Sequence, residues 1–117
     1  MTPPSKINLN KATTVLTVTF DDIEYELTSE FLRVYSPSAE VVGHGPGQET
    51  LQVGKEGVTI KNIVPTGNYA VVLNFSDGHD TGIYSWSHLY DLSINHNDLW
   101  IKYLNKLREA GHDHSKL

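Results

Sequence analysis

Alternating apolar and polar positions mark the first part of the chain as a β-hairpin. Apolar residues occupy every second position in two runs, Leu16, Val18 and Phe20 and then Ile23, Tyr25 and Leu27. A period of two is typical of strands with one buried face. Asp21 and Asp22 between the runs favour a turn, although a turn without glycine is a weaker signal for a two-residue connection. We therefore predict an antiparallel hairpin over residues 15–27.

A second hairpin is predicted in the middle of the chain. Residues 58–64 and 69–75 are rich in β-branched and aromatic side chains, and residues 65–68, Pro-Thr-Gly-Asn, have the composition of a turn. The run 69–75 carries apolar side chains on both faces. This pattern predicts a central strand, because only a strand covered on both sides buries both sets.

One short helix and one long loop follow the first hairpin. Ser29 can cap a helix that ends near residues 34–35, because Pro37 disfavours helical geometry at the residue before it. Residues 36–57 are interrupted by glycines and prolines and predict an irregular loop, with a short strand at residues 51–53.

Two helices are predicted at the C-terminal end. Ser85 suits the N-cap of the first. Residues 98–110 place their large apolar side chains on one stripe, and Gly111 behind them suits a C-cap. We predict flexible ends at residues 1–6 and 112–117, because neither carries an apolar anchor.

These elements predict one small α+β domain of residues 1–117 with a core from about residue 7 to residue 111. The architecture is a mostly antiparallel sheet of two hairpins, with a short helix after the first hairpin and two C-terminal helices. A chain of 117 residues suits a single core. The edge strand at residues 23–27 carries Glu24 and Glu26, which discourage open-ended strand pairing, so we expect a monomer or a weak homodimer.

Charge and composition exclude several classes of function. Nine Lys and Arg against fourteen Asp and Glu give a net charge of −5, which repels polyanions and argues against nucleic acid as a partner. The absence of cysteine excludes disulfides, thiolate nucleophiles and cysteine metal ligands. Without an apolar run of membrane-spanning or signal-peptide length we expect no membrane partner and a cytoplasmic location.

Three stretches together carry a resemblance to a known family. They are FLRVYSPSAEV at residues 31–41, GHGPGQ at residues 43–48, and residues 68–86, which include FSDGHDTGIYSW. In order and spacing the chain resembles the gamma-butyrobetaine hydroxylase-like N-terminal domain family, in its stand-alone bacterial form, from about residue 7 to residue 111. The resemblance implies a compact α+β domain and no reaction. It also implies relatives placed ahead of oxygenase catalytic domains or attached to iron-sulfur carrier ATPases.

In the oxygenase relatives the resemblance implies a structural zinc held by three cysteines and one histidine. The cysteine positions correspond here to Ser36, Ser38 and Val41, and the histidine position to His79. Serine is a poor zinc ligand and valine is none, so the zinc site is not carried over and we expect no cofactor. The catalytic iron domain of the oxygenase relatives has no counterpart in this sequence, and the sequence shows no Ser–His–acid or Cys–His arrangement. We expect no catalytic residues.

Two readings of the function remain open. The first is a non-catalytic accessory domain that binds a partner protein, by resemblance an iron-sulfur carrier or an oxygenase. Its candidate surface is formed by Arg33, Ser36, Ser38, Glu40, His44, Gly45, Gly47, Gln48, Asp77, His79 and Asp80. These positions are polar or glycine, lie in irregular segments and are not required by the core. We also predict a surface ion pair between Arg33 and Glu40.

The second reading is a metal-binding protein with a small site made from His44, His79 and Asp80, suited to iron or another divalent ion and serving a regulatory or enzymatic role. It competes with a structural role in which residues 77–78 form a turn and His79 bonds to nearby backbone. His112 and His114 lie in the predicted flexible tail, where ordering entropy opposes metal binding.

Overall fold

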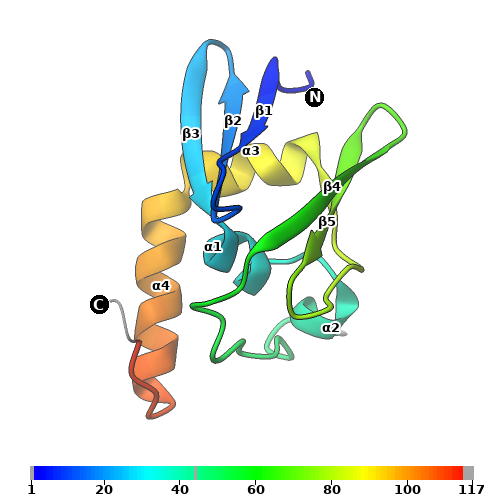
Figure 1. The fold of residues 1–117 in the computed structure, drawn as a ribbon. Coiled ribbons are helices and arrows are strands. Elements are labelled where there is room, and N and C mark those ends of the chain that lie inside the picture. Colours follow the sequence, from blue (N-terminus) through cyan, green and yellow to red (C-terminus); the bar gives the residue numbers. More distant parts are fainter. Residues whose placement is uncertain (1, 44, 115–117) are drawn as a thin grey trace.

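The computed structural model describes residues 2–43 and 45–114 and has the α+β architecture predicted above. It contains two three-stranded antiparallel sheets and four helices. In Figure 1 the two sheets stand side by side, α3 passes behind them and α4 lies to one side, and α3 contacts both β3 and β6. No helix in the described part of the chain is long and apolar enough to cross a membrane.

The first sheet has the order β1-β2-β3, from β1 (Lys6–Leu9), β2 (Val15–Phe20) and β3 (Ile23–Thr28). The hairpin prediction is confirmed, and β3 is an edge strand. Asp21 and Asp22 both have positive φ, 51° and 64°, as a primed two-residue turn requires. The flexible start predicted for residues 1–6 is wrong for Ser5 and Lys6, which pair with Thr19 in β2.

The second sheet has the order β4-β5-β6, from β4 (Ile60–Thr66), β5 (Ala70–Phe75) and β6 (Ile83–Ser85). The central position of β5 is confirmed. β6 was not predicted, because three residues are too few to show a period of two. Pairing of Val71 with Tyr84 brings the segment after β5 back onto the sheet.

Four helices complete the fold: α1 (Ser29–Val34), α2 (Ala39–Val42), α3 (Trp86–Ile94) and α4 (His96–Glu109). Ser85 caps α3 as predicted. The cap of α1 is Thr28, not Ser29, whose hydroxyl donates to the Val58 carbonyl oxygen instead. The predicted strand at residues 51–53 does not form, and α2 was missed, because a single helical turn within a glycine-rich loop has no periodic signal.

One main hydrophobic cluster joins both sheets to α1 and α3. Its fully buried members are Leu16, Val18, Leu27, Phe31, Leu32, Ile60, Leu73, Tyr84 and Leu89. A smaller cluster of Val34, Tyr103 and Leu107 packs α4 against the end of α1. Helix α4 therefore closes one side of the core with the apolar stripe that its sequence predicts.

The C-terminal segment is ordered further than predicted. After α4 the amide of Gly111 donates to the Arg108 carbonyl and the amide of His112 donates to the Leu107 carbonyl. Gly111 has a φ of 81°, and this combination is a Schellman C-cap. The cap turns the chain back, and His114 is only 6% exposed. The prediction of a flexible tail is wrong for residues 112–114, and residues 115–117 lie outside the described part.

Candidate functional site

Ser36 and His79, which the resemblance places at one zinc site, lie in direct contact. The Ser36 hydroxyl oxygen is 2.8 Å from His79 Nε2, and His79 Nδ1 is 3.5 Å from a Glu40 carboxylate oxygen. Ser36 follows α1, Glu40 is on α2, and His79 follows the turn after β5. Ser36 is fully buried and His79 is 6% exposed. We call these residues, with Ser38 and Thr81, the Ser36 cluster.

Ser38 and Thr81 extend the Ser36 cluster towards the surface. Their hydroxyl oxygens are 2.8 Å apart, and Thr81 donates to Glu40 at 3.1 Å. Because Thr81 has one hydroxyl proton, Ser38 must be the donor in the pair between them. Ser38 also accepts from the Glu40 amide as the N-cap of α2, and its own amide donates to Ser36. The cluster therefore fixes α2 against the turn that carries His79.

The imidazole of His79 is neutral at physiological pH. Burial lowers the pKa of His79 and the nearby Arg33 lowers it further, and these effects outweigh the opposing influence of Glu40. A neutral imidazole has one donor and one acceptor nitrogen. With the proton on Nδ1, which lies 3.5 Å from a Glu40 carboxylate oxygen, Nε2 accepts the Ser36 hydroxyl proton.

The contacts Ser36–His79–Glu40 resemble the catalytic triad of hydrolases, and the sequence analysis did not predict them. The contact between Ser36 and His79 could have been predicted, because the family resemblance assigns both positions to one zinc site. Burial argues against catalysis, because Ser36 has no exposed surface through which a substrate carbonyl could approach its oxygen. The family's structural zinc does not fit either, since its four positions offer one imidazole and two engaged hydroxyls, and Val41 has no donor atom.

Arg33 does not form the predicted surface ion pair with Glu40. It is 7% exposed, its Nε is 2.9 Å from Asp77 Oδ2, and its Nη1 donates to Gln52 at 3.0 Å. Lys55 contacts the same Asp77 oxygen at 2.8 Å. Burial raises the pKa of Asp77, but the hydrogen bonds from Lys55, from the His79 amide and from Arg33 prevail and lower the pKa to about 2. These bonds tie α1, the long loop and the turn after β5 together.

Of the alternative metal set, His79 has both ring nitrogens facing the Ser36 cluster, and Asp80 is exposed. His44 lies outside the described residues. Gly43 in the glycine-rich loop has a φ of 76°, and a side-chain carbon there would collide with the Gln48 carbonyl oxygen, so this position requires glycine.

The predicted interaction surface divides into a buried and an exposed half. Its buried members are Arg33, Ser36, Ser38 and His79. Its exposed members include Glu40, Gly47, Gln48, Asp77 and Asp80. The first group positions the second, so only the exposed group can touch another molecule in this conformation.

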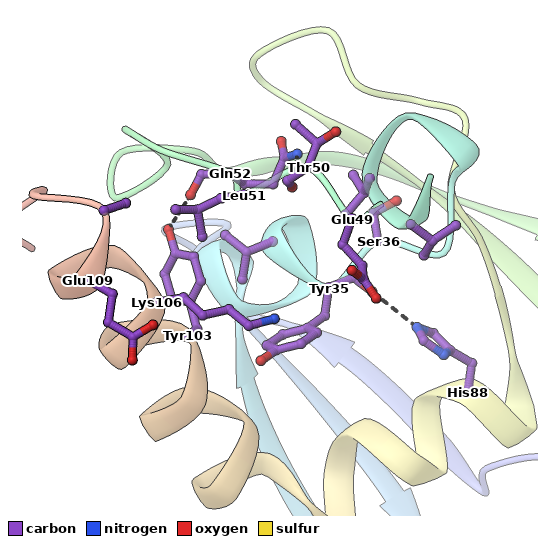
Figure 2. Close-up of a pocket in the computed structure, with 14 residues that line it drawn as sticks. Tyr35, Ser36, Glu49, Thr50, Leu51, Gln52, His88, Tyr103, Lys106 and Glu109 are labelled. Carbon is purple, nitrogen blue, oxygen red and sulfur yellow. Dashed lines mark hydrogen bonds between the residues drawn. The ribbon is translucent and has the colours of Figure 1, made fainter. Parts of the chain in front are cut away.

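A groove of about 560 Å³ lies next to the exposed half and was not predicted. Figure 2 shows it between the end of α1, residues 49–52 and α4, and Val41 and Val42 of α2 also line it. Apolar lining comes from Val34, Tyr35, Val41, Val42, Leu51 and Tyr103, and charged or polar groups come from Glu49, His88, Lys106 and Glu109. The groove brings together segments far apart in the sequence, which a local pattern cannot reveal.

Two hydrogen bonds hold the walls of this groove. The Tyr103 hydroxyl donates to the Gln52 carbonyl oxygen at 2.7 Å, which fixes residues 49–52 to α4. His88 Nε2 is 3.1 Å from the Tyr35 carbonyl oxygen, which fixes α3 to the end of α1. Because the carbonyl can only accept, His88 donates from Nε2. The groove is therefore pre-formed rather than a gap between loose segments.

Comparisons with known proteins identify relatives over most of the chain. Residues 7–90 match the family described as gamma-butyrobetaine hydroxylase-like, N-terminal. One solution NMR structure is 45% identical, with 100% of this chain and 96% of the other covered and a TM-score of 0.85. A second solution NMR structure is 47% identical, with 97% of this chain and 86% of the other covered and a TM-score of 0.80.

A crystal structure of a protein of unknown function from Acidithiobacillus ferrooxidans ATCC 23270, of the DUF971 family, is also similar. It is 40% identical, covers 77% of this chain and 91% of its own, and has a TM-score of 0.62. The search of curated proteins found no match.

Proposed function

This chain belongs to the gamma-butyrobetaine hydroxylase-like N-terminal domain family, and from that premise we propose that it is a non-catalytic domain that binds a partner protein. The groove beside α2 is the observation that carries the proposal. Concave sites lined by apolar and aromatic side chains with a few polar groups are the usual form of a binding site. The partner inserts apolar side chains into the groove, and its polar groups meet the charged rim.

Helix α2 connects the groove to the exposed half of the predicted surface. Val42 is 44% exposed at the groove, whereas Glu40 on the same helix faces the turn of Thr81 and Asp80. A binding face of this kind has an apolar centre and a polar rim. The Ser36 cluster supports it indirectly, because it holds α2 in place through the Ser38 cap.

The class of partner is an analogy to the family rather than a property of the groove. By the resemblance, we propose an iron-sulfur carrier or an oxygenase as the partner. A net charge of −5 favours a protein over a nucleic acid. The burial of Ser36 supports a binding role over hydrolysis by the Ser36 cluster.

A pair of matched variants tests this proposal. Val42→Glu places a charge in the groove, and Val64→Glu places the same charge on β4, away from it. The two valines are 44% and 45% exposed, so both variants are expected to fold. Partners are captured from the native host under anaerobic conditions, identified by mass spectrometry, purified and titrated against each variant.

We expect Val42→Glu to weaken binding by at least tenfold, since charges are depleted at interface cores. Val64→Glu should bind like the unmodified protein. Equal binding by both variants would place the partner elsewhere on the surface. Loss of binding in Val64→Glu alone would move the interface to the second sheet.

A further inference from the structure

The outer face of the second sheet carries an exposed apolar row. Val71 and Leu73 of β5 belong to the main hydrophobic cluster, so Val72 between them points to the opposite face of the sheet. Val72 pairs with Val64 of β4 on one side and with Ile83 of β6 on the other, which places the three side chains in one row. Val64 is 45% and Ile83 is 51% exposed. Water therefore contacts apolar side chains at both ends of the row.

Uncharged residues flank this row on the same face. On one side Asn62 pairs with Asn74, and on the other Thr66 and Ser85 both pair with Ala70. None of the positions in these three rows carries a charged side chain. We call the three rows together the uncharged face.

The outer face of the first sheet, by contrast, is charged. Lys6 and Glu24 flank Thr19 in one row, and Glu26 pairs with Thr17 in the next. Glu24 and Glu26 are exposed. In a chain with a net charge of −5, acidic groups of two copies repel one another wherever they meet. The uncharged face is free of this repulsion, so it can meet its own copy.

The edges of the second sheet do not favour the addition of another strand. β4 contains Pro65, which has no N–H, and its pairing with β5 shifts register between Ile60 and Asn62. β6 at the other edge has only 3 residues. Proline, register shifts and short edge strands all hinder pairing with another chain. A second molecule is therefore expected to approach across the face of this sheet rather than along its edges.

We propose that two copies of this chain associate through the uncharged face. A two-fold interface presents the same surface from both copies, so each group must suit its counterparts. Apolar side chains do so, and so do Asn62, Asn74 and Ser85, because amides and hydroxyls both donate and accept. The two sheets then pack face to face, about 10 Å apart, as in a β-sandwich. None of these residues lines the groove, so the two binding surfaces are separate.

The small size of the uncharged face sets the strength of this dimer. Three short strands offer few side chains compared with the roughly 20–30 residues that each partner contributes to a stable interface. We expect a dissociation constant on the order of 100 μM. Sedimentation equilibrium of the full chain, from about 20 μM to about 1 mM, should show a reversible equilibrium between monomer and dimer.

A matched pair of isoleucine variants tests where the two copies meet. Ile83→Lys sets like charges against each other in the interface and should weaken dimerisation at least tenfold. Ile101→Lys is the control, because Ile101 on α4 is 58% exposed and lies outside the uncharged face, and its dissociation constant should not change. Sodium chloride should tighten the dimer severalfold, because it screens the repulsion between two acidic chains, whereas it would weaken an interface made of ion pairs.

Thermal unfolding of the variants checks that they fold. If Ile83→Lys is unstable, the amide NMR shifts of the unmodified protein provide the test, because those of Val64, Val72 and Ile83 should change with protein concentration. A chain that stays monomeric throughout, equal association by Ile83→Lys and Ile101→Lys, or shift changes confined to other surfaces overturns the proposal. If the chain stays monomeric and Ile83→Lys instead loses a captured partner protein, that protein covers the face and the proposal is overturned as well.

Discussion

The Ser36 cluster and a second cluster, formed by Glu30, Glu56 and His114, lie at opposite ends of α1 and use a buried histidine in contrasting ways. In the first, the His79 ring contacts a hydroxyl at 2.8 Å and the Glu40 carboxylate at 3.5 Å, and the Glu40 side chain is 67% exposed. In the second, His114 contacts the buried carboxylate of Glu30 at 2.6 Å, with a further carboxylate nearby. One cluster pairs its imidazole with a hydroxyl, and the other pairs its imidazole with a buried carboxylate.

The difference shows that the kind of oxygen beside a histidine decides what the cluster can do. Hydroxyls both donate and accept, so Ser36, Ser38 and Thr81 satisfy one another without an ion. Carboxylates only accept, so the Glu30 carboxylate needs a donor, and His114 Nε2 lies 2.6 Å from it. The Ser36 cluster therefore fixes α2 against the turn that carries His79, whereas the second cluster links the segment after α4 to the start of α1.

The largest effect is expected from restoring thiolates to the Ser36 cluster. A triple variant, Ser36→Cys, Ser38→Cys and Val41→Cys, recreates the donor set that the family resemblance assigns to zinc, with His79 as the fourth ligand. Zinc at a thousandfold excess over its dissociation constant would raise the melting temperature by roughly 15 °C. Adding His79→Ala should remove most of that gain. If zinc does not change the melting temperature of the triple variant, these positions do not converge as the resemblance implies.

A smaller effect is expected from crowding the same cluster. A side-chain carbon at Gly82 would lie 2.5 Å from the Ser36 hydroxyl and 3.1 Å from the Tyr84 ring. Gly82→Ala should destabilise the protein by about 2 kcal/mol in urea unfolding, because the hydroxyl is held by hydrogen bonds and cannot move freely. Gly57→Ala is the control, since no atom lies within 4 Å of its added carbon. Equal stability of the two variants would mean that the cluster is loosely packed.

Acid titration provides a weaker test of the bonds around Asp77. The lowered pKa of Asp77, about 2, means that its stabilisation is present above the unfolded pKa near 3.8 and is lost as pH falls towards 2. After allowance for solvent screening we expect a loss of about 1 kcal/mol between pH 5 and pH 2. Asp77→Asn should lack this component. The measurement is the free energy of unfolding of both proteins across that range.

The smallest effect concerns His79 near neutral pH. Because burial lowers the pKa of His79, the unfolded chain takes up a proton more readily than the folded protein. Stability should therefore fall as pH drops below about 6.5. His79→Gln keeps a neutral polar group and should flatten this slope in urea unfolding at pH 5.5, 6.5 and 7.5. Identical pH dependence of the free energy of unfolding in the two proteins would show that protonation of His79 does not destabilise the fold.

The sequence predicted those parts of the fold that have local periodicity. The hairpin of β2 and β3, the central strand β5, the Ser85 cap and the stripe of α4 all follow from side chains a few positions apart. β1, β6 and α2 were missed, because four residues or fewer do not define a period. Pairing with β2 and β5 determines β1 and β6, and such pairing is a long-range property.

The candidate sites were predictable only where a resemblance supplied long-range information. It linked Ser36 to His79 across 43 positions, and these residues are in contact. The burial of Arg33 and its pairing with Asp77 were not predictable, because they depend on how the loop folds over α1. His114 was set aside as part of a flexible tail, although Gly111 already indicated that the chain turns back after α4.

Histidine-detected ¹⁵N NMR at pH 7 tests the contrast between the two clusters most directly. It reads the ring nitrogens of His79 and His114 in one sample, with His79→Gln and His114→Ala providing the assignments. We predict that His79 shows a fixed neutral tautomer with its proton on Nδ1, because Nε2 accepts from Ser36. Nε2 of His114 should carry a proton, because it lies 2.6 Å from a Glu30 carboxylate oxygen that accepts. A proton on Nε2 of His79, or none on Nε2 of His114, would contradict the account.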